Sequence, residues 1–353
     1  MIGRHRFIAS QIMQSKRPSL ARVHPASETT WQQQYRDSIT RIDTLCNALE
    51  LHANELSISQ TAERQFPLRV PWSYVGRMQK SNPHDPLLLQ VLPHALEEQE
   101  AAGYGPDPVG DLASVKSPGL LKKYHGRALL LATSRCAVHC RFCFRRHFPY
   151  ALQNPRGDAW RSALDEITAD SSIEEIILSG GDPLVLADHE LAQLVRHLQA
   201  IPHLRRLRVH TRLPVVIPAR INGELLDWIN ASELGIVVVL HVNHPRELDH
   251  ELQERLRTLS AARCRVLNQS VLLQNVNDDP DTLVALSERL FDSGVLPYYL
   301  HLLDKVQGAM HFDVDEPTAC AIMKEVAARL PGYLVPRLVR EQAGEPGKTP
   351  VQF

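Results

Sequence analysis

Short apolar runs alternate with amphipathic stretches along the C-terminal two thirds of the chain. Six runs rich in Leu, Ile and Val have the length of strands, and the segments between them repeat apolar residues at helical spacing. The predicted strands cover 128–133, 175–178, 206–210, 236–241, 265–272 and 297–302, and the predicted helices cover 161–169, 190–200, 223–230, 247–259 and 281–293. Continuously apolar strands separated by helices are typical of a parallel sheet covered on both faces. The pattern therefore predicts an α/β fold, either a full sheet or an incomplete barrel.

The first third of the chain has a different pattern. Residues 30–121 read as helices and loops, with a helix over 31–49 and a Pro-, Gly- and Asp-rich segment over 103–110. Residues 1–27 lack acidic side chains, but Pro18 and a weak amphipathic pattern favour a disordered start over a mitochondrial presequence. We therefore predict four parts: a disordered N-terminus (1–30), a helical N-terminal region (31–122), the α/β core (123–310) and a C-terminal segment (311–353).

Polar side chains follow the predicted strands. In chain order they are Cys136, Ser179, His210, His241 and Asp304, with Gln269 inside the fifth strand. The carboxyl ends of parallel strands lie at one edge of a sheet and carry the active site in α/β architectures. We therefore expect these residues to share one site.

Composition excludes several classes of protein. The chain has 353 residues, 44% of them hydrophobic, and a formal net charge of −1. A near-neutral chain is not suited to nucleic-acid binding through bulk phosphate attraction. It contains neither an apolar stretch of about 20 residues nor a signal peptide, so we expect no membrane span and a cytoplasmic location. Six cysteines in a chain of this length are too few for a disulfide framework, and Cys46, Cys264 and Cys320 are expected in apolar packing.

The other three cysteines form a CxxxCxxC motif, Cys136, Cys140 and Cys143, directly after the first predicted strand. A closed structural zinc site needs four ligands, which His139 or His147 would complete. A [4Fe–4S] cluster normally takes four cysteines, so three would leave one iron open to an outside ligand. The position of the motif, after a strand and before a basic and aromatic segment, favours the cluster.

This motif resembles that of the radical S-adenosylmethionine superfamily. The resemblance implies that the three cysteines hold the cluster and that S-adenosylmethionine chelates the open iron. The segment from Ser179 through Gly180, Gly181 and Asp182 resembles the superfamily's glycine-rich element, in which a Cβ would block the approach of the methionyl amine. His241 and Gln269 are placed in the same cofactor pocket, with a buried structural role as the alternative for His241. The implied fold is an incomplete (β/α)6 TIM-type barrel with an N-terminal helical subdomain.

Residues 67–348 resemble the lysine 2,3-aminomutase family. The similarity is carried by 124–143, 179–184, 268–273, 297–299 and the Gly/Pro-bounded loop 344–350. By this resemblance Lys348 forms an imine with pyridoxal 5′-phosphate, whereas without it Lys348 would read as a solvated tail lysine. Lys123 and Tyr124 are placed at the phosphate of pyridoxal 5′-phosphate.

Three further residues are placed at the substrate by the same resemblance. Arg145 meets the substrate α-carboxylate, and Asp304 meets the distal ammonium. Glu341 stands where the free-lysine enzymes have aspartate, which keeps the charge on a longer side chain. Two acids at the distal end argue against a glutamate substrate, because like charges repel.

The implied reaction converts (S)-α-lysine to (R)-β-lysine by a 5′-deoxyadenosyl radical mechanism assisted by pyridoxal phosphate. The segment 143–150 and the chain length resemble the short bacterial members that supply (R)-β-lysine for modification of elongation factor P. The implied partners are lysine, elongation factor P with its lysyl-transferring ligase, and a reductant such as flavodoxin. The alternative is an aminomutase that makes free β-lysine for catabolism or biosynthesis.

Overall fold

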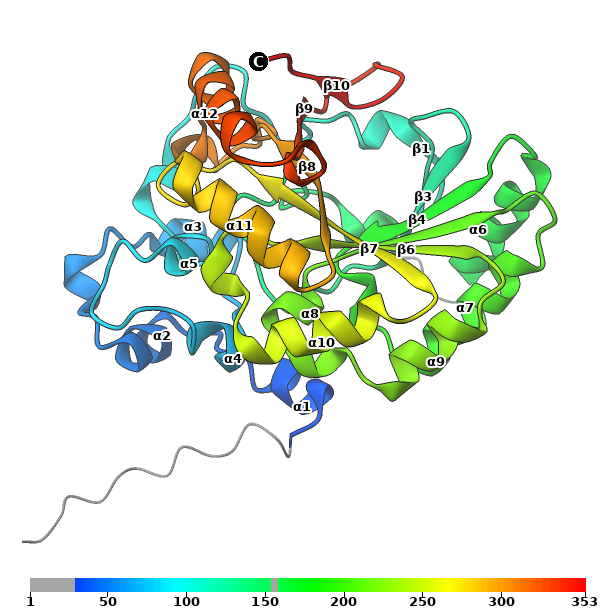
Figure 1. Cartoon of the computed structure of the whole chain (residues 1–353), viewed down its shortest axis with the longest axis horizontal. Helices are drawn as coiled ribbons and strands as arrows, with labels where there is room; N and C mark the ends of the chain where they lie inside the picture. The colour runs from blue at the N-terminus through cyan, green and yellow to red at the C-terminus, as the bar shows by residue number, and fades with distance from the viewer. Residues whose placement is uncertain (1–28, 154–157) are drawn as a thin grey trace, which may run out of the picture.

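The computed structural model describes residues 29–153 and 158–353, and a ten-stranded sheet forms its centre (Figure 1). The strands lie side by side in chain order. They are β1 (Val115–Ser117), β2 (Leu120–Leu121), β3 (Arg127–Thr133), β4 (Glu175–Gly180), β5 (Arg206–Thr211), β6 (Gly235–His241), β7 (Cys264–Val271), β8 (Leu296–His301), β9 (Arg337–Arg340) and β10 (Thr349–Pro350). All pairings from β3 to β9 are parallel, whereas β1, β2 and β10 pair antiparallel at the two edges.

The predicted parallel α/β sheet is confirmed. Strands β3 to β8 match the six predicted strands within two residues at each end. Their apolar side chains form most of the core, as in β6, where Ile236, Val238 and Leu240 are at most 3% exposed. The prediction missed β9, a short strand whose Leu338 and Val339 are buried between two exposed or half-buried arginines. This strand extends the parallel sheet into the C-terminal part of the chain.

Helices follow the strands around the outside of the sheet (Figure 1). The five predicted ones correspond to α6 (Asp158–Ala169), α7 (Asp188–Gln199), α9 (Gly223–Ala231), α10 (His250–Ser260) and α11 (Pro280–Asp292). The start predicted for α10 at residue 247 is wrong. The side chain of Asp249 accepts a hydrogen bond from the amide of Leu252, which fixes the N-cap, and Pro245–Glu247 form a separate 3-10 turn. A further helix, α12 (Glu316–Arg329), packs on α11 and was not predicted.

The single helix predicted over 31–49 is wrong, because two helices cover this segment. They are α1 (Trp31–Arg36) and α2 (Ile42–Leu49). Between them Ile39 is extended and forms a bridge with Val70, with N···O distances of 2.8 and 3.0 Å in the two directions. The buried bridge outweighs the helical periodicity of the surrounding sequence.

Short helices fill the rest of the N-terminal region. They are α3 (Gln60–Gln65), α4 (Trp72–Val75) and α5 (Pro86–Leu89). The predicted disordered segment 1–30 lies, except for its last two residues, outside the described part of the chain. Within 29–153 and 158–353, no helix is long and apolar enough to cross a membrane.

Candidate active site

A cavity of about 280 Å³ lies at the carboxyl ends of the parallel strands. Its lining contains every site residue predicted from the sequence: Lys123, Tyr124, Cys136, Cys140, Cys143, Arg145, Ser179, Gly180, Gly181, Asp182, His241, Gln269, Asp304, Glu341 and Lys348. These residues come from β4, β6 and β7, from the loops that precede β3 or follow β3, β4 and β8, and from the C-terminal segment. The structure therefore brings them together in one site.

The three motif cysteines lie in the loop after β3 and face the cavity. Both histidines that would complete a zinc site are engaged elsewhere. His139 Nδ1 lies 2.7 Å from the carbonyl oxygen of Pro67, and His147 Nε2 lies 3.1 Å from that of Gln307. In the described residues no three acidic, histidine or cysteine side chains converge on one ion position. A cluster has no such requirement, because each thiolate binds a different iron.

Hydrogen bonds and ion pairs from the N-terminal region hold the cysteine loop. The backbone amides of His139 and Arg141 donate to the carbonyl oxygens of Arg69 and Gln90, at 3.0 and 2.9 Å. The fully buried Arg141 guanidinium forms two hydrogen bonds with Glu97, at 2.9 and 2.6 Å. Burial opposes ionisation of Glu97, but Arg141 and Arg146 outweigh it and hold the pKa of this carboxyl below its ordinary value. The buried ion pairs fix the loop in one position.

Gly180 and Gly181 are required by the chain itself. Gly180 has φ +110°, and a Cβ there would lie 2.8 Å from the carbonyl oxygen of Thr133. A Cβ on Gly181 would lie 2.3 Å from the carbonyl oxygen of Arg135. The structure gives these glycines a role within the chain, because they let β4 approach the start of the cysteine loop. Both also line the cavity, and their approach to a cofactor stays a prediction.

Gly181→Ala should destabilise the protein by at least about 2 kcal/mol, because the added Cβ collides with backbone that cannot rotate away. Denaturant unfolding and iron content per chain would measure the effect. Gly223→Ala is the matched control, since a Cβ at the start of α9 meets nothing within 4 Å. Equal stability of both variants would contradict the close approach of β4 to the loop.

Asp182 lines the cavity, but both of its carboxylate oxygens are used by the chain. Oδ1 accepts from the amide of Leu184 and the hydroxyl of Thr211, at 3.0 and 2.7 Å. Oδ2 accepts from the amides of Arg212 and Leu213, each at 2.7 Å. This carboxylate therefore ties the end of β4 to the end of β5.

A chain of alternating charges crosses the cavity wall. Arg145 Nε and Lys123 Nζ each lie 2.6 Å from a different oxygen of Asp111. Glu341 continues the chain, with Oε1 3.1 Å from Lys123 Nζ and Oε2 2.6 Å from Lys348 Nζ. Burial opposes ionisation of Glu341, but Lys348 and Lys123 outweigh it, so its pKa lies below the ordinary range. The alternating ion pairs thus link Arg145, beside the cysteine loop, to Lys348 in the C-terminal segment.

Asp111 is a site residue that sequence reasoning missed. It is 1% exposed and contacts both Arg145 and Lys123. In the sequence it follows a Gly- and Pro-rich segment, where aspartate is an ordinary turn residue. No signal in the sequence distinguishes it from the aspartates before it.

Among the described residues, no cation forms an ion pair with the buried Asp304 carboxyl group. Burial and the neighbouring Glu341 raise its pKa to about 7, while Lys348 and Lys123 offset only part of this rise. A bound cation would stabilise the ionised form of this carboxyl group. The cavity therefore suits a ligand with a cation at this end.

Several buried polar atoms in the cavity wall have no hydrogen-bond partner among the described residues. They are Arg127 Nε, His210 Nε2, His241 Nε2 and His301 Nε2. Buried polar groups are almost always paired, so this set indicates a polar ligand. The His241 ring stacks on Phe142 at 5.5 Å, and burial lowers its pKa to about 3, so the ring is neutral. Arg127 and His301 were not predicted.

A family described as a 4Fe-4S single cluster domain matches residues 125–206. This span contains Cys136, Cys140 and Cys143 together with the end of β4. The match and the cavity at the strand ends define the class of protein: an α/β enzyme with an iron–sulfur centre.

Similar proteins identify the family. The chain is 48% identical over 332 residues to a protein named L-lysine 2,3-aminomutase from Escherichia coli (strain K12), covering 94% of this chain and 97% of that one. It is 48% identical over 322 residues to one of the same name from Haemophilus influenzae, covering 91% and 95%. The corresponding protein of Clostridium subterminale is 31% identical over 330 residues, covering 93% and 79%. The chain belongs to the L-lysine 2,3-aminomutase family of radical S-adenosylmethionine isomerases, which use pyridoxal phosphate.

Proposed function

We propose that this protein converts (S)-α-lysine to (R)-β-lysine. The observation that carries the proposal is one cavity whose lining combines three thiols and Arg145 with Asp304 and Lys348. A substrate with a carboxylate at one end and an ammonium at the other matches this distribution of charge. The relatives named L-lysine 2,3-aminomutase give the same substrate.

Cys136, Cys140 and Cys143 would hold the [4Fe–4S] cluster, and Lys348 would hold pyridoxal phosphate. When bound, the cluster with S-adenosylmethionine supplies the radical chemistry, and pyridoxal phosphate supplies a conjugated ring that spreads the unpaired electron. Burial raises the pKa of Cys143 to about 11, so binding of iron has to compensate the loss of its proton. The unpartnered Nε2 of His241 suits a polar group of S-adenosylmethionine, as does the half-buried Gln269.

The phosphate of pyridoxal phosphate suits Arg127 better than Lys123. Lys123 Nζ already contacts the carbonyl oxygen of Val109 at 2.8 Å and the carboxylates of Asp111 and Glu341. Arg127 keeps an unpartnered Nε and lies over the Tyr124 ring at 4.8 Å. We therefore assign Arg127 and Tyr124 to the phosphate, and Lys123 to the charge balance of the wall.

Arg145 would bind the substrate carboxylate. Asp111 accepts from Nε at 2.6 Å and Ser179 accepts from Nη1 at 2.9 Å, so the guanidinium has one orientation. Because Arg145 lies two residues after Cys143, the carboxylate end of lysine would lie near the cluster. This fixed geometry suits a reaction that needs the substrate carbon close to the radical.

Asp304→Asn should weaken lysine binding by about 10- to 100-fold at pH 8, because a hydrogen bond between charged groups is lost. In the unaltered protein, protons compete with the ammonium for a carboxyl whose pKa is about 7. Lysine affinity should therefore fall as pH drops below 7, approaching tenfold per pH unit, and the amide variant should lack this dependence.

Anaerobic binding titrations from pH 5.5 to 8.5 would test both the weaker binding and the pH dependence. Asp313→Asn, outside the cavity, is the control, and unchanged affinity of Asp304→Asn would reject the role.

We further propose that the product modifies elongation factor P. The support is the resemblance of segment 143–150 to the bacterial enzymes with that role. The lysyl-transferring ligase would use the β-lysine, and flavodoxin is the proposed reductant. Mass spectrometry of elongation factor P from cells with and without this gene would test the proposal. Free β-lysine without modified elongation factor P would favour the alternative role.

The fold itself supports a finer description. We propose that β3 to β8 and their helices form an incomplete (β/α)6 barrel, with residues 31–122 as an N-terminal helical subdomain and 311–353 as the segment that brings Lys348 to the cavity. The sequential parallel pairing of these strands is what such a barrel requires.

Anaerobic incubation with lysine, S-adenosylmethionine and a reductant, followed by product analysis, tests the enzymatic proposal. The protein should be brown, with a broad visible absorbance band, and should form β-lysine. A colourless, zinc-loaded protein that leaves lysine unchanged would overturn it.

A further inference from the structure

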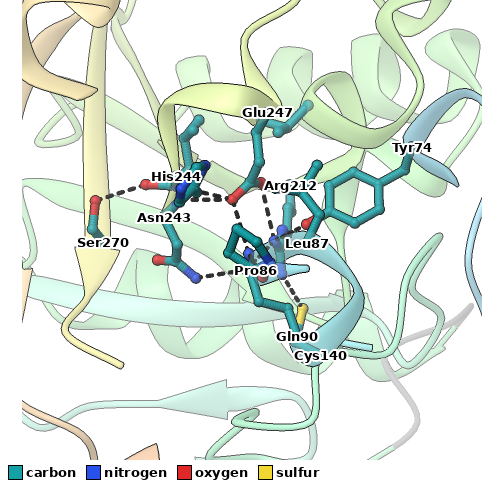
Figure 2. Close-up of polar contacts among 12 residues, drawn as sticks. Tyr74, Pro86, Leu87, Gln90, Cys140, Arg212, Asn243, His244, Glu247 and Ser270 are labelled. Carbon is teal, nitrogen blue, oxygen red and sulfur yellow. Dashed lines mark hydrogen bonds and ion pairs between the residues drawn. The ribbon is translucent and has the colours of Figure 1, made fainter. Parts of the chain in front are cut away.

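Arg212 is a buried residue beside the cysteine loop that the roles above leave unused. It follows β5, and its side chain is 7% exposed (Figure 2). Its Nη1 donates to Cys140 Sγ at 2.8 Å. The thiols of Cys136 and Cys143 instead have hydrogen bonds with the backbone of Asp182 and Arg145. In the described part of the chain, Cys140 is thus the motif cysteine that has a charged donor.

Other buried groups fix the guanidinium independently of the thiol. Nη2 donates to Gln90 Oε1 at 2.6 Å, to Glu247 Oε2 at 3.0 Å and to the hydroxyl of Tyr74 at 3.2 Å. Glu247 is fully buried, and its Oε1 accepts from the backbone amides of Asn243 and His244, at 3.0 and 3.1 Å. Figure 2 shows Glu247 and Cys140 on opposite sides of the guanidinium. The network therefore presents Nη1 to the thiol in one orientation.

A charged donor at this position affects the two redox states of a cluster differently. Reduction adds one negative charge, and the field of a buried cation stabilises the more negative state. Hydrogen bonds to the cluster sulfurs are one of the factors that set the reduction potential. Glu247 acts in the opposite sense, because its negative charge disfavours the added electron.

We propose that Arg212 is a positioning residue that raises the reduction potential of the cluster through its hydrogen bond to Cys140. Tyr74 and Gln90 hold it in place, which gives the N-terminal region a part in setting the potential. The inference rests on the proposed role of Cys140 as a cluster ligand.

Redox titration of the full chain with a reconstituted cluster, followed by electron paramagnetic resonance, tests the proposal. Arg212→Met should lower the equilibrium constant for reduction about tenfold, which is a shift of about 59 mV to more negative potential. Glu247→Gln should shift the potential the other way, because Arg212 then lacks its counter-charge. Arg212→Lys should give a smaller negative shift than Met, since the charge is kept but the fork is lost.

Arg220→Met is the matched control. Arg220 is fully buried and lies 2.8 Å from Asp188, but it contacts no cysteine among the described interactions. The cluster of Arg220→Met should have the same reduction potential as that of the unaltered protein. A shift like that of Arg212→Met would show that loss of any buried arginine near the core changes the potential, and it would overturn the proposal.

Two other results would overturn the proposal. One is an unchanged reduction potential in an Arg212→Met variant that keeps its full iron content, and the other is an unchanged or lowered reduction potential in Glu247→Gln. If Arg212→Met retains no cluster, the direction of the shift in Glu247→Gln decides. An unaltered chain that binds no cluster would instead remove the proposed function. The two failures are therefore distinguishable.

Discussion

Lys348→Ala should abolish covalent attachment of pyridoxal phosphate and lower turnover at least roughly 10³-fold, while iron content should stay at the level of the unaltered protein. The reason is the position of the side chain. Lys348 lies directly before β10, which pairs with β9, and its ammonium lies 2.6 Å from the Glu341 carboxylate in the cavity. Borohydride reduction followed by peptide mass spectrometry measures the attachment.

The cavity contains a second lysine, which supplies the control. Lys123 Nζ contacts Val109, Asp111 and Glu341, so we expect it to balance charge in the cavity wall and not to attach the cofactor. Lys123→Ala should therefore retain the covalent cofactor although its activity falls. Labelling of Lys123, or full turnover by Lys348→Ala, would exclude Lys348 from the assigned role.

The strands were predictable because burial on both faces leaves a direct trace in the sequence. Runs such as that of β6 are continuously apolar, and the polar residues that follow them are already candidates for the site. The same rule fails for β9, whose four residues include only two buried apolar ones. The break between α1 and α2 also escaped prediction, because the bridge from Ile39 to Val70 is a contact between distant segments.

The same holds for the candidate site, where local patterns were predictable and contacts between distant segments were not. Cysteine spacing and family resemblance were enough to name many of the residues that line the cavity, but not Asp111, Arg127 or His301, which line it too. Asp111 and Arg212 are as buried as the named residues and contact Arg145 and Cys140, yet neither belongs to a motif. Their importance comes from charge pairing across the fold, and a sequence does not state which charges meet.

The glycines show the same limit of sequence analysis in physical terms. The resemblance gave one reason for their small size, the approach of a cofactor, and the distances to Thr133 and Arg135 add a second. Both reasons require the same residue type, so the second could be found only from the coordinates of the neighbouring backbone.

Replacing Cys136, Cys140 or Cys143 singly with alanine should remove the cluster and abolish turnover, while pyridoxal phosphate stays attached to Lys348. Two thiolates cannot hold a cluster that takes one cysteine at each of three irons. No other cysteine lines the cavity within 29–153 and 158–353, so no substitute ligand is close. Iron content and the visible absorbance band measure the loss.

Cys320→Ala is the matched control, since its thiol contacts the carbonyl oxygen of Gln352 at 3.5 Å, away from the motif. It should keep both the cluster and the activity. Together with Lys348→Ala, these variants separate the two cofactors: one change removes pyridoxal phosphate and spares iron, and the other removes iron and spares pyridoxal phosphate. A cysteine variant that kept its full iron content and turned over lysine would show that the motif is not the cluster site, and it would remove the basis for assigning Arg145 to the cluster end of the substrate.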